Sequence, residues 1–419
     1  MDFSKHPCFS AEARHTTGRI HLPVAPKCNI QCNFCNRKFD CVNESRPGVA
    51  STILSPDQAL GYLKEVDERV ENLAVVGIAG PGDPFANAEE TIATMKKVGE
   101  AFPEKILCLA TNGLGLLEYV DEIASLNVSH VTVTLNAVDP EIGAKIYSWI
   151  RFGSRILRGV EGAKLLLERQ TAAITALKAR GVTVKINTVI IPGINDGHAE
   201  EVARYAAALG ADVQNCIPLM HVEETAFADR PVPDAGEMQA LRFAAGKHLR
   251  QMSHCARCRA DAVGKLGEAN TEEIQALLKK AARIGPTDER PFIAVASREG
   301  LFVNCHVGEA LQLWIFKNEN GKPVLIERRP TPVPGGGDER WEALAKTIPD
   351  CFALLASGCG NAPLTILAKR GIAVTAAECL VRDAAEPLFR GDPIPKVLER
   401  AAGSCGSGAL CSGTGTGCA

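Results

Sequence analysis

The sequence predicts an α/β protein, with a partial (β/α)6-type barrel followed by a second, smaller α/β domain. Two patterns support this prediction. Apolar strand-like runs alternate with helical runs over roughly residues 20–220, and the composition changes after Ala262. A chain of 419 residues is also long enough to bury the cores of two domains.

The predicted barrel elements follow one another as strand and helix. Ser55 is the expected N-cap of the first helix, with Pro56 at its first position. Strict alternation implies right-handed crossovers and a parallel sheet of about six strands, whose carboxyl ends carry the functional site. The expected strands are residues 73–79, 105–110, 131–135, 182–190 and 213–217, and the expected helices include 88–100, one through Leu165 and Ala176, and 199–208.

Three segments describe the domain organisation. Residues 1–285 form the barrel with an N-terminal arm and a late cysteine pair, 286–400 form the second domain, and 401–419 form a Gly, Ser and Cys tail that we expect to be disordered. An amphipathic helix over 270–284 and a linker over 285–291 join the first two. The expected second-domain strands are 292–296, 311–316, 324–327 and 353–356, with a hairpin turn at 318–321 and helices through 341–345 and 364–369.

Charge and composition exclude several classes of partner. The formal net charge is −3, so there is no basic field for nucleic acid or for a membrane surface. No apolar run is long enough to span a bilayer, and the N-terminus lacks a signal-peptide core, so we expect a cytoplasmic protein. Sixteen cysteines in that compartment indicate metal ligation rather than a disulfide framework.

Cys28, Cys32 and Cys35 form the most informative motif, Cys-x3-Cys-x2-Cys. Thiolates are soft, charged donors that suit iron, and this short loop can hold three corners of a cubane 4Fe-4S cluster. The fourth iron then stays open for a small molecule. The alternative is a structural zinc site, which normally closes four ligands from two Cys-x2-Cys pairs.

Polar residues follow several predicted strands. Gly80, Gly82 and Asp83 lie in a turn whose backbone can approach a ligand closely. The alternative is an ordinary βα turn, which has the same residue types. Thr134 and Asn136 end one later strand, and Asn187 lies in the next. Cys108, in the strand over 105–110, is by itself more typical of a small core residue than of a ligand.

Together the cysteine motif and the glycine-rich turn one βα unit later resemble the radical S-adenosylmethionine (SAM) enzymes. The resemblance covers roughly residues 20–220. It implies a 4Fe-4S cluster on Cys28, Cys32 and Cys35, with SAM chelating the open iron. It further implies that Gly80, Gly82 and Asp83 contact the methionyl amine, and that Thr134, Asn136 and Asn187 line the nucleoside. Reduction of SAM would release a 5'-deoxyadenosyl radical.

Five further segments are similar to the nitrogenase cofactor biosynthesis branch of that family: residues 6–8, 19–26, 36–41, 43–48 and 254–262. This resemblance implies two further 4Fe-4S clusters, bound as substrates in the barrel mouth and fused into the eight-iron precursor of the iron-molybdenum cofactor. It further implies that one SAM donates the methyl group that becomes a central carbide and that one extra sulfur is added. The implied partners are an iron-sulfur cluster donor, an electron donor, and scaffold and carrier proteins of nitrogenase assembly.

The resemblance also implies the ligands of the substrate clusters. Cys41, Cys255 and Cys258 would hold one cluster, and Cys8 and Cys108 the other. His21 or His6 would supply an imidazole, and we favour His21; a packed or solvated histidine is the alternative. Cys255-x2-Cys258 is alternatively half of a zinc site, but no second pair stands at suitable spacing. Glu44 and Arg46 follow Cys41 and either orient SAM or a cluster sulfide, or form a solvated ion pair.

The second domain resembles the ribonuclease H-like cofactor-carrier domain of nitrogenase accessory proteins. Carriers of this type have a histidine after an asparagine at the second strand, and Asn304 and His306 match that place. His306 is therefore a candidate ligand for the product, with Cys305 and Cys359 as alternatives, and a docking module without metal remains open. For the whole chain, the alternatives are a radical SAM enzyme acting on a peptide or small organic substrate, and a non-enzymatic iron-sulfur scaffold or carrier.

Overall fold

The computed structural model of the chain describes residues 6–10, 12–43 and 45–400. The chain divides into two compact units, Met1–Ala282 and Arg283–Ala419, and each unit is described by itself. The domain limits at residues 285 and 400 stay a prediction. Glu44 and the tail over 401–419 lie outside the described residues. Within the described part of the chain, every helix is too short or too polar to cross a membrane.

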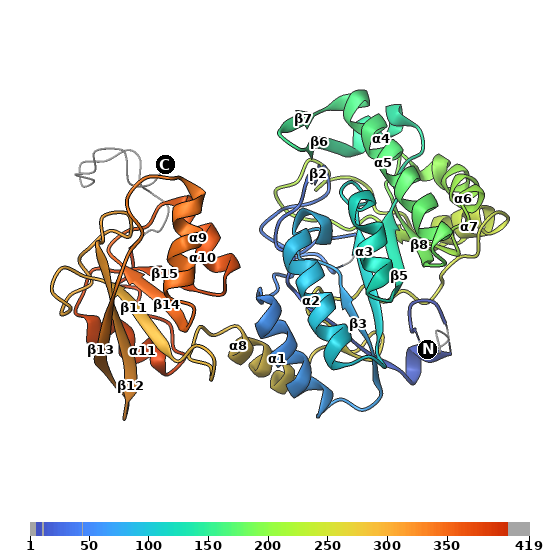
Figure 1. The fold of residues 1–419 in the computed structure, drawn as a ribbon. Coiled ribbons are helices and arrows are strands. Elements are labelled where there is room, and N and C mark those ends of the chain that lie inside the picture. The colour runs from blue at the N-terminus through green and yellow to red at the C-terminus, as the bar shows by residue number, and fades with distance from the viewer. Residues whose placement is uncertain (1–5, 11, 44, 401–419) are drawn as a thin grey trace. The chain divides into compact units, whose positions relative to one another are not determined.

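The first unit is built on a seven-stranded sheet. Its strands are β1 (Gly18–His21), β3 (Leu73–Ile78), β4 (Ile106–Thr111), β5 (Val128–Thr134), β8 (Thr183–Ile190), β9 (Val213–Pro218) and β10 (Val263–Gly264). The first six are parallel and lie side by side in chain order, and β10 is antiparallel at the β1 edge (Figure 1). The predicted partial (β/α)6-type barrel is therefore confirmed.

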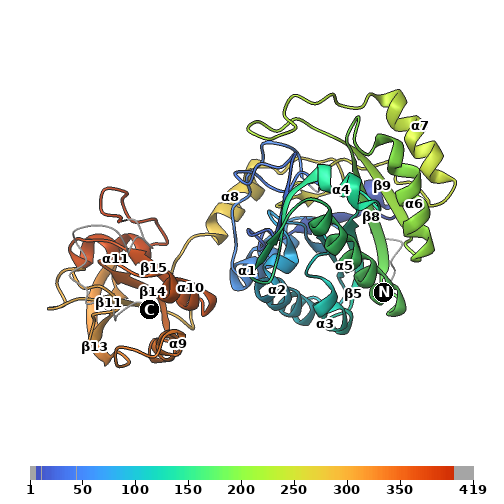
Figure 2. The same cartoon turned by 90° about the horizontal axis from the view of Figure 1, so that it is seen from above.

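Helices cover the outer face of this sheet. The helices of this unit are α1 (Pro56–Asp67), α2 (Ala88–Ala101), α3 (Val120–Ser125), α4 (Pro140–Ile146), α5 (Gly159–Ala179), α6 (Ala199–Ala208), α7 (Ala235–Gly246) and α8 (Glu272–Ala281). Of these, α4 packs against α5 and β6, and α8 packs against α1. Ser55 caps α1 as predicted, because its hydroxyl accepts from the Gln58 amide while the Gln58 side chain accepts from the Ser55 amide. Outward strand residues such as Val76, Leu109 and Val131 pack with the helices in one apolar core. Figure 2 shows α6 and α7 on the outside of β8 and β9.

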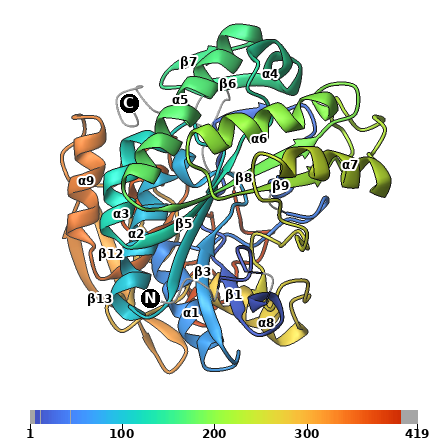
Figure 3. The same ribbon diagram turned by 90° about the vertical axis from the view of Figure 1, so that its right-hand side faces the viewer.

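Residues 250–264, here called the strap, join the two edges of the open sheet. At one end, Gln214 of β9 exchanges backbone hydrogen bonds with Arg250 and Met252. At the other end, the His21 amide donates to the carbonyl of Ala262, and β10 pairs with β1. The strap carries Cys255 and Cys258 to the open side of the sheet, whose strands are seen side by side in Figure 3.

A small second sheet was not predicted. It consists of β2 (Ile30–Cys32), β6 (Tyr147–Phe152) and β7 (Arg155–Leu157), in the order β2-β6-β7. The hairpin β6-β7 interrupts the βα alternation between α4 and α5, and its partner β2 comes from the cysteine loop more than a hundred residues earlier. Single turns of 3-10 helix occur at Ala13–His15, Pro84–Ala86, Leu117–Tyr119 and Asp196–His198.

The second unit is a smaller α/β domain, as predicted. Its strands are β11 (Phe292–Ala296), β12 (Gln312–Glu319), β13 (Lys322–Pro330), β14 (Cys351–Ala356) and β15 (Ala373–Ala376), and its helices are α9 (Asp338–Thr347), α10 (Asn361–Lys369) and α11 (Val381–Phe389). The sheet order is β13-β12-β11-β14-β15. One core contains Trp341 of α9 and Leu367 of α10, and another contains Leu388 of α11. The prediction missed β15 and α11.

Candidate functional site

The structure brings Cys28, Cys32 and Cys35, here called the triad, to one cavity of about 420 Å³, the triad cavity. Two contacts shape the loop that carries them. Cys32 lies opposite Tyr147 in the β2-β6 pairing, and Nε2 of the Gln31 side chain donates to the carbonyls of Cys32 and Cys35. The loop is therefore fixed by the Gln31 side chain and by a hairpin inserted far along the chain.

The glycine-rich turn after β3 supports the triad loop directly. The Gly82 amide donates to the Ala25 carbonyl, and the Asp83 amide donates to the Lys27 carbonyl. A Cβ atom at Gly82 would lie 2.0 Å from the Lys27 carbonyl oxygen. Gly82 is thus required by the backbone that leads into Cys28, besides lining the triad cavity.

The Asp83 carboxylate organises the end of β4. It accepts from the Thr111 hydroxyl at 2.9 Å, from the Asn112 amide at 2.6 Å and from the Phe85 amide at 2.9 Å. Asp83 lines the triad cavity, but these donors occupy its oxygens, whereas Gly80 is absent from the cavity wall as described. Of the three predicted contacts to SAM, only Gly82 and Asp83 face the cavity.

Burial sets the chemistry of the triad. It raises the pKa of Cys28 to about 12, with the Asp83 charge adding to the effect, and it raises the pKa of Cys32 and Cys35 as well. Arg37 opposes this shift at all three thiols. Without iron the thiols are therefore protonated and neutral at physiological pH.

The triad suits a cubane cluster better than a single ion. Three thiols in one half-enclosed cavity are the donor set that an iron-sulfur cluster requires. A cubane distributes its thiolates over separate irons, so they need not converge on one point. In the described ranges, no three His, Cys, Asp or Glu side chains converge on one point.

Asn112 was not selected from the sequence as a site residue. Its side chain donates to the Cys28 sulfur at 3.8 Å and to the Asn29 side chain at 2.7 Å, and it lines the triad cavity. The signal was present in Thr111-Asn112-Gly113, the polar end of a predicted strand. Arg37 and Ile30 also line this cavity and were missed.

The three residues expected around the nucleoside do not share one cavity wall, although Thr134 and Asn187 lie opposite each other in the β5-β8 pairing. Thr134 lines the triad cavity, and Asn187 lines a second cavity. Asn136 is among the wall residues of neither as described. Its side-chain oxygen accepts from the Val189 amide and its carbonyl accepts from the Asn195 side chain, so it joins the segment after β5 to β8 and to the loop that follows β8.

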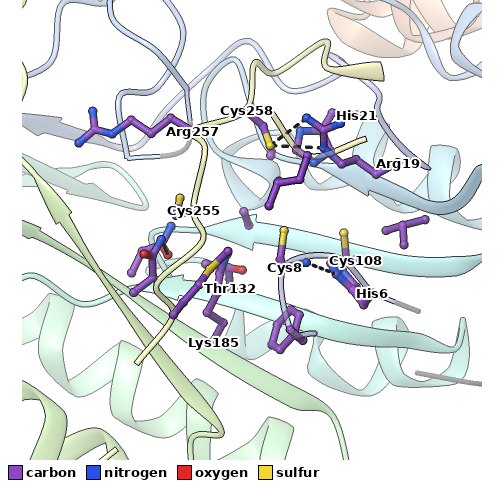
Figure 4. A pocket seen from close by; sticks show the side chains of 18 of the residues that line it. His6, Cys8, Arg19, His21, Cys108, Thr132, Lys185, Cys255, Arg257 and Cys258 are labelled. Carbon is purple, nitrogen blue, oxygen red and sulfur yellow. Dashed lines mark hydrogen bonds between the residues drawn. The ribbon is translucent and has the colours of Figure 1, made fainter. Parts of the chain in front are cut away.

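A second cavity of about 700 Å³, the inner cavity, adjoins the first, and Asn43 and Ala110 line both. It collects six of the predicted metal ligands from four parts of the chain (Figure 4). Those in its wall are His6, Cys8, His21, Cys108, Cys255 and Cys258. Cys41 is instead in the wall of the triad cavity, where its amide donates to the Pro81 carbonyl and Asn43 donates to its sulfur.

The inner cavity lies within the barrel rather than at its rim. Cys108 was expected near a strand end, but β4 continues for three more residues, to Thr111. Gly77 lies opposite Cys108, and His21 lies opposite Gly77, so these residues share one layer of the sheet. Thr134, at the end of β5, belongs to the triad cavity above them.

The N-terminal arm brings Cys8 to this cavity. The His254 ring bonds to the Pro7 carbonyl at 3.0 Å, and Arg250 donates to the Phe9 carbonyl, so the arm rests on the strap. The Phe9 ring packs edge-on against His130 of β5, with ring centroids 4.5 Å apart. Burial raises the pKa of the Cys8 thiol to about 11.

Hydrogen bonds distinguish the two candidate histidines. Nδ1 of His21 lies 2.9 Å from the Arg259 carbonyl, so it must donate, and the lone pair of Nε2 is left available. Nδ1 of His6 accepts from the Cys8 amide, so Nε2 of this ring carries the proton. The His6 Nε2 atom is buried and has no hydrogen-bond partner within the described part of the chain. His21 is thus arranged as a ligand, and His6 as a donor.

The remaining predicted residues lie elsewhere. Arg46 is exposed and donates to the Arg257 carbonyl of the strap, outside both cavity walls. In the second unit, the loop with His306 precedes β12 instead of lying in that strand. The His306 Nδ1 atom accepts from the Gly308 amide, and the side chains of Cys305 and Cys359 are buried nearby in one core.

Two family models match the chain. Residues 22–206 match the radical SAM superfamily, and residues 289–391 match the family described as dinitrogenase iron-molybdenum cofactor. Among solved structures, SuiB of Streptococcus suis, crystallised with S-adenosylmethionine, is 14% identical with a TM-score of 0.41, over 55% of this chain and 49% of that one. With its cysteine triad, the chain is a radical SAM enzyme, a class that binds one 4Fe-4S cluster and SAM.

Curated relatives identify the family within that class. The FeMo cofactor biosynthesis protein NifB of Chlorobaculum tepidum is 50% identical, over 100% of this chain and 99% of that protein. The NifB proteins of Klebsiella pneumoniae and Azotobacter vinelandii are 40% and 38% identical, over 88% of this chain and 86% and 84% of theirs. The chain belongs to the NifB family of FeMo cofactor biosynthesis proteins.

Proposed function

We propose that this enzyme fuses two 4Fe-4S clusters, inserting a carbide that derives from the methyl group of SAM together with one extra sulfur. The product is the eight-iron precursor of the iron-molybdenum cofactor. One observation carries the proposal: a cavity with four cysteines and two histidines adjoins the triad cavity through a shared wall. A substrate held there is next to the place where SAM is cleaved, as a short-lived radical requires.

The triad cavity is the proposed site of SAM cleavage. Cys28, Cys32 and Cys35 hold the cluster, and Gly82, Asp83 and Thr134 contact SAM. When bound, the reduced cluster and SAM supply the 5'-deoxyadenosyl radical. The chain itself orients SAM and excludes water, because the side chains of Asp83 and Thr134 are nearly fully buried. Gly80 and Asn136 remain proposed contacts, although neither is in a cavity wall as described. Glu44, which lies outside the described residues, also remains a proposal.

The inner cavity is the proposed site of the substrate clusters. Its thiols approach from the arm, from β4 and from the strap, and His21 supplies the imidazole. Cys41 lies in the wall of the triad cavity, and Asn43, which donates to its sulfur, lines both cavities. Cys41 can therefore reach a substrate cluster only where the two cavities meet. Arg46 acts through the strap loop that carries Cys255 and Cys258, since it donates to the Arg257 carbonyl.

The second unit is the proposed carrier or docking domain, because it matches the iron-molybdenum cofactor family. His306 is its candidate ligand. The proposed partners are an iron-sulfur cluster donor, an electron donor, and scaffold and carrier proteins of nitrogenase assembly. Cytoplasmic localisation stays a prediction.

Anaerobic reconstitution tests this function. The loaded chain should hold about three times the iron of one cubane cluster. With SAM and a reductant it should form both 5'-deoxyadenosine and S-adenosylhomocysteine. Iron for a single cluster would favour a radical enzyme with an organic substrate, and full iron without either product would favour a scaffold. Both outcomes contradict the proposal.

A further inference from the structure

Arg19 of β1 places a buried positive charge in the wall of the inner cavity. Only 2% of its surface is exposed. Its Nε and Nη2 atoms donate to the Cys258 sulfur at 3.4 and 3.2 Å, and these two bonds are drawn in Figure 4. Both donors lie on the same edge of the guanidinium and point to one sulfur. This edge binds the oxygens of a carboxylate in the same way.

Two backbone carbonyls hold the other edge of this guanidinium. Nη1 donates to the carbonyl of Gly264 and, at 2.7 Å, to that of Lys265. Arg19 lies opposite Gly264 in the β1-β10 pairing, so the sheet fixes the backbone at both ends of this contact. The guanidinium therefore has little freedom to leave the sulfur.

The charge of Arg19 is not balanced by a carboxylate. Its partners in the described ranges are one sulfur and two carbonyls. A buried charge is costly unless it meets an opposite charge. Among the partners of Arg19 in the described ranges, Cys258 is the side chain that can supply that charge, as a thiolate or as part of an anionic cluster.

We propose that Arg19 is a positioning residue that directs the Cys258 sulfur into the inner cavity and stabilises the more reduced state of the cluster bound there. The proposal rests on the proposed function, because it takes Cys258 as a cluster ligand. Hydrogen bonds and positive charge at a ligand sulfur favour the state with the extra electron, so they raise the reduction potential.

The test is a redox titration of the full chain, anaerobically loaded with iron and sulfide and followed by electron paramagnetic resonance. Addition of SAM changes the signal of the triad cluster and thereby separates it from the others. We compare the wild type with Arg19→Met, which removes charge and donors, and with Arg19→Lys, which keeps the charge. Arg180→Met is the control, since Arg180 pairs with Asp121 in the outer helix layer.

Arg19→Met should lower the midpoint potential of a cluster that does not respond to SAM. The expected change is at least tenfold in the reduction equilibrium, about 59 mV for one electron. Arg19→Lys should recover most of it, and the triad cluster and the Arg180→Met chain should keep wild-type potentials. Loss of the inner clusters in Arg19→Met with recovery in Arg19→Lys also supports the proposal.

Two results overturn it in distinguishable ways. Full iron loading of Arg19→Met with an unchanged potential, or equal loss of iron in both Arg19 variants, overturns the role of Arg19 and leaves the proposed function standing. A wild-type chain that holds only the triad cluster overturns both.

Discussion

Gly77 of β3 lies between two proposed ligands. A Cβ atom there would lie 2.7 Å from the Cys108 sulfur and 3.1 Å from Cδ2 of His21. No other residue leaves room for both side chains on the inner face of the sheet. A small residue is therefore needed to let two chemically active neighbours approach each other.

Gly77→Ala should displace Cys108 and His21 and abolish precursor formation, while SAM cleavage to 5'-deoxyadenosine continues. The measurement is product analysis beside iron content. Gly61→Ala is the matched control: that glycine lies in α1 with open space around it, so the alanine should stabilise the fold by about 0.5–1 kcal/mol. Normal precursor yield from Gly77→Ala would contradict the crowding argument.

The two histidines should respond differently to removal. His21→Ala should strongly reduce cluster binding in the inner cavity, because it deletes the only ring of the two whose Nε2 lone pair is available. His6→Ala should retain the iron and lose less activity. Iron counts and nitrogen couplings in pulsed paramagnetic resonance distinguish the two. A nitrogen coupling that disappears in His6→Ala would reverse the assignment.

Cluster loading should depend on pH. Burial raises the pKa of Cys28 to about 12, above the usual 9.0, so the empty thiol is protonated at neutral pH. Iron can bind only as each proton leaves, so binding strengthens as the pH rises, by at most about tenfold per unit for each thiol. Anaerobic competition with a chelator between pH 6.5 and 8.5 measures this. Affinity that does not change with pH would show that the thiols are already ionised.

At the scale of elements, different segments hold the cysteines of the inner cavity and those of the triad. The strap brings Cys255 and Cys258 to the inner cavity, whereas the triad depends on β2 and its pairing with β6. The two cysteine groups therefore belong to different structural supports. A change in one group should leave the other in place.

Cys255→Ala should spare SAM cleavage but stop precursor formation, and Cys32→Ala should abolish both 5'-deoxyadenosine and S-adenosylhomocysteine. Chromatography of the products, with iron counts for each variant, measures the difference. Cys216→Ala is the control, because Cys216 is buried in a separate apolar cluster behind β9. Undiminished precursor yield from Cys255→Ala would remove the strap from the ligand set.

At the scale of the whole molecule, the two units have separate cores. Every residue of both cavity walls lies in the first unit. The reaction should therefore not require the second unit.

A chain ending at Ala282 should fold and cleave SAM at the wild-type rate, because it keeps both cavities. It should still form the precursor, but transfer of that product to an acceptor protein should be slower. Rates of 5'-deoxyadenosine formation and of precursor transfer are the measurements. Loss of SAM cleavage in a folded, iron-loaded truncation would contradict the separation.

The sequence by itself determined the fold class and the triad. Alternation of apolar runs predicted β3 and α6 closely, because their periodicity reflects burial on one face. The spacing of Cys28, Cys32 and Cys35 is local, so the motif could be recognised without any tertiary contact.

Only the tertiary structure decided how distant segments meet. The hairpin β6-β7, the separation of Cys41 from Cys255 and the contact of Arg19 with Cys258 depend on pairings between residues far apart in the chain. The same holds for the hydrogen bonds that distinguish His21 from His6. Local sequence patterns do not predict such contacts. The register of the strands and the path of the strap determine them, and both are established only when the chain folds.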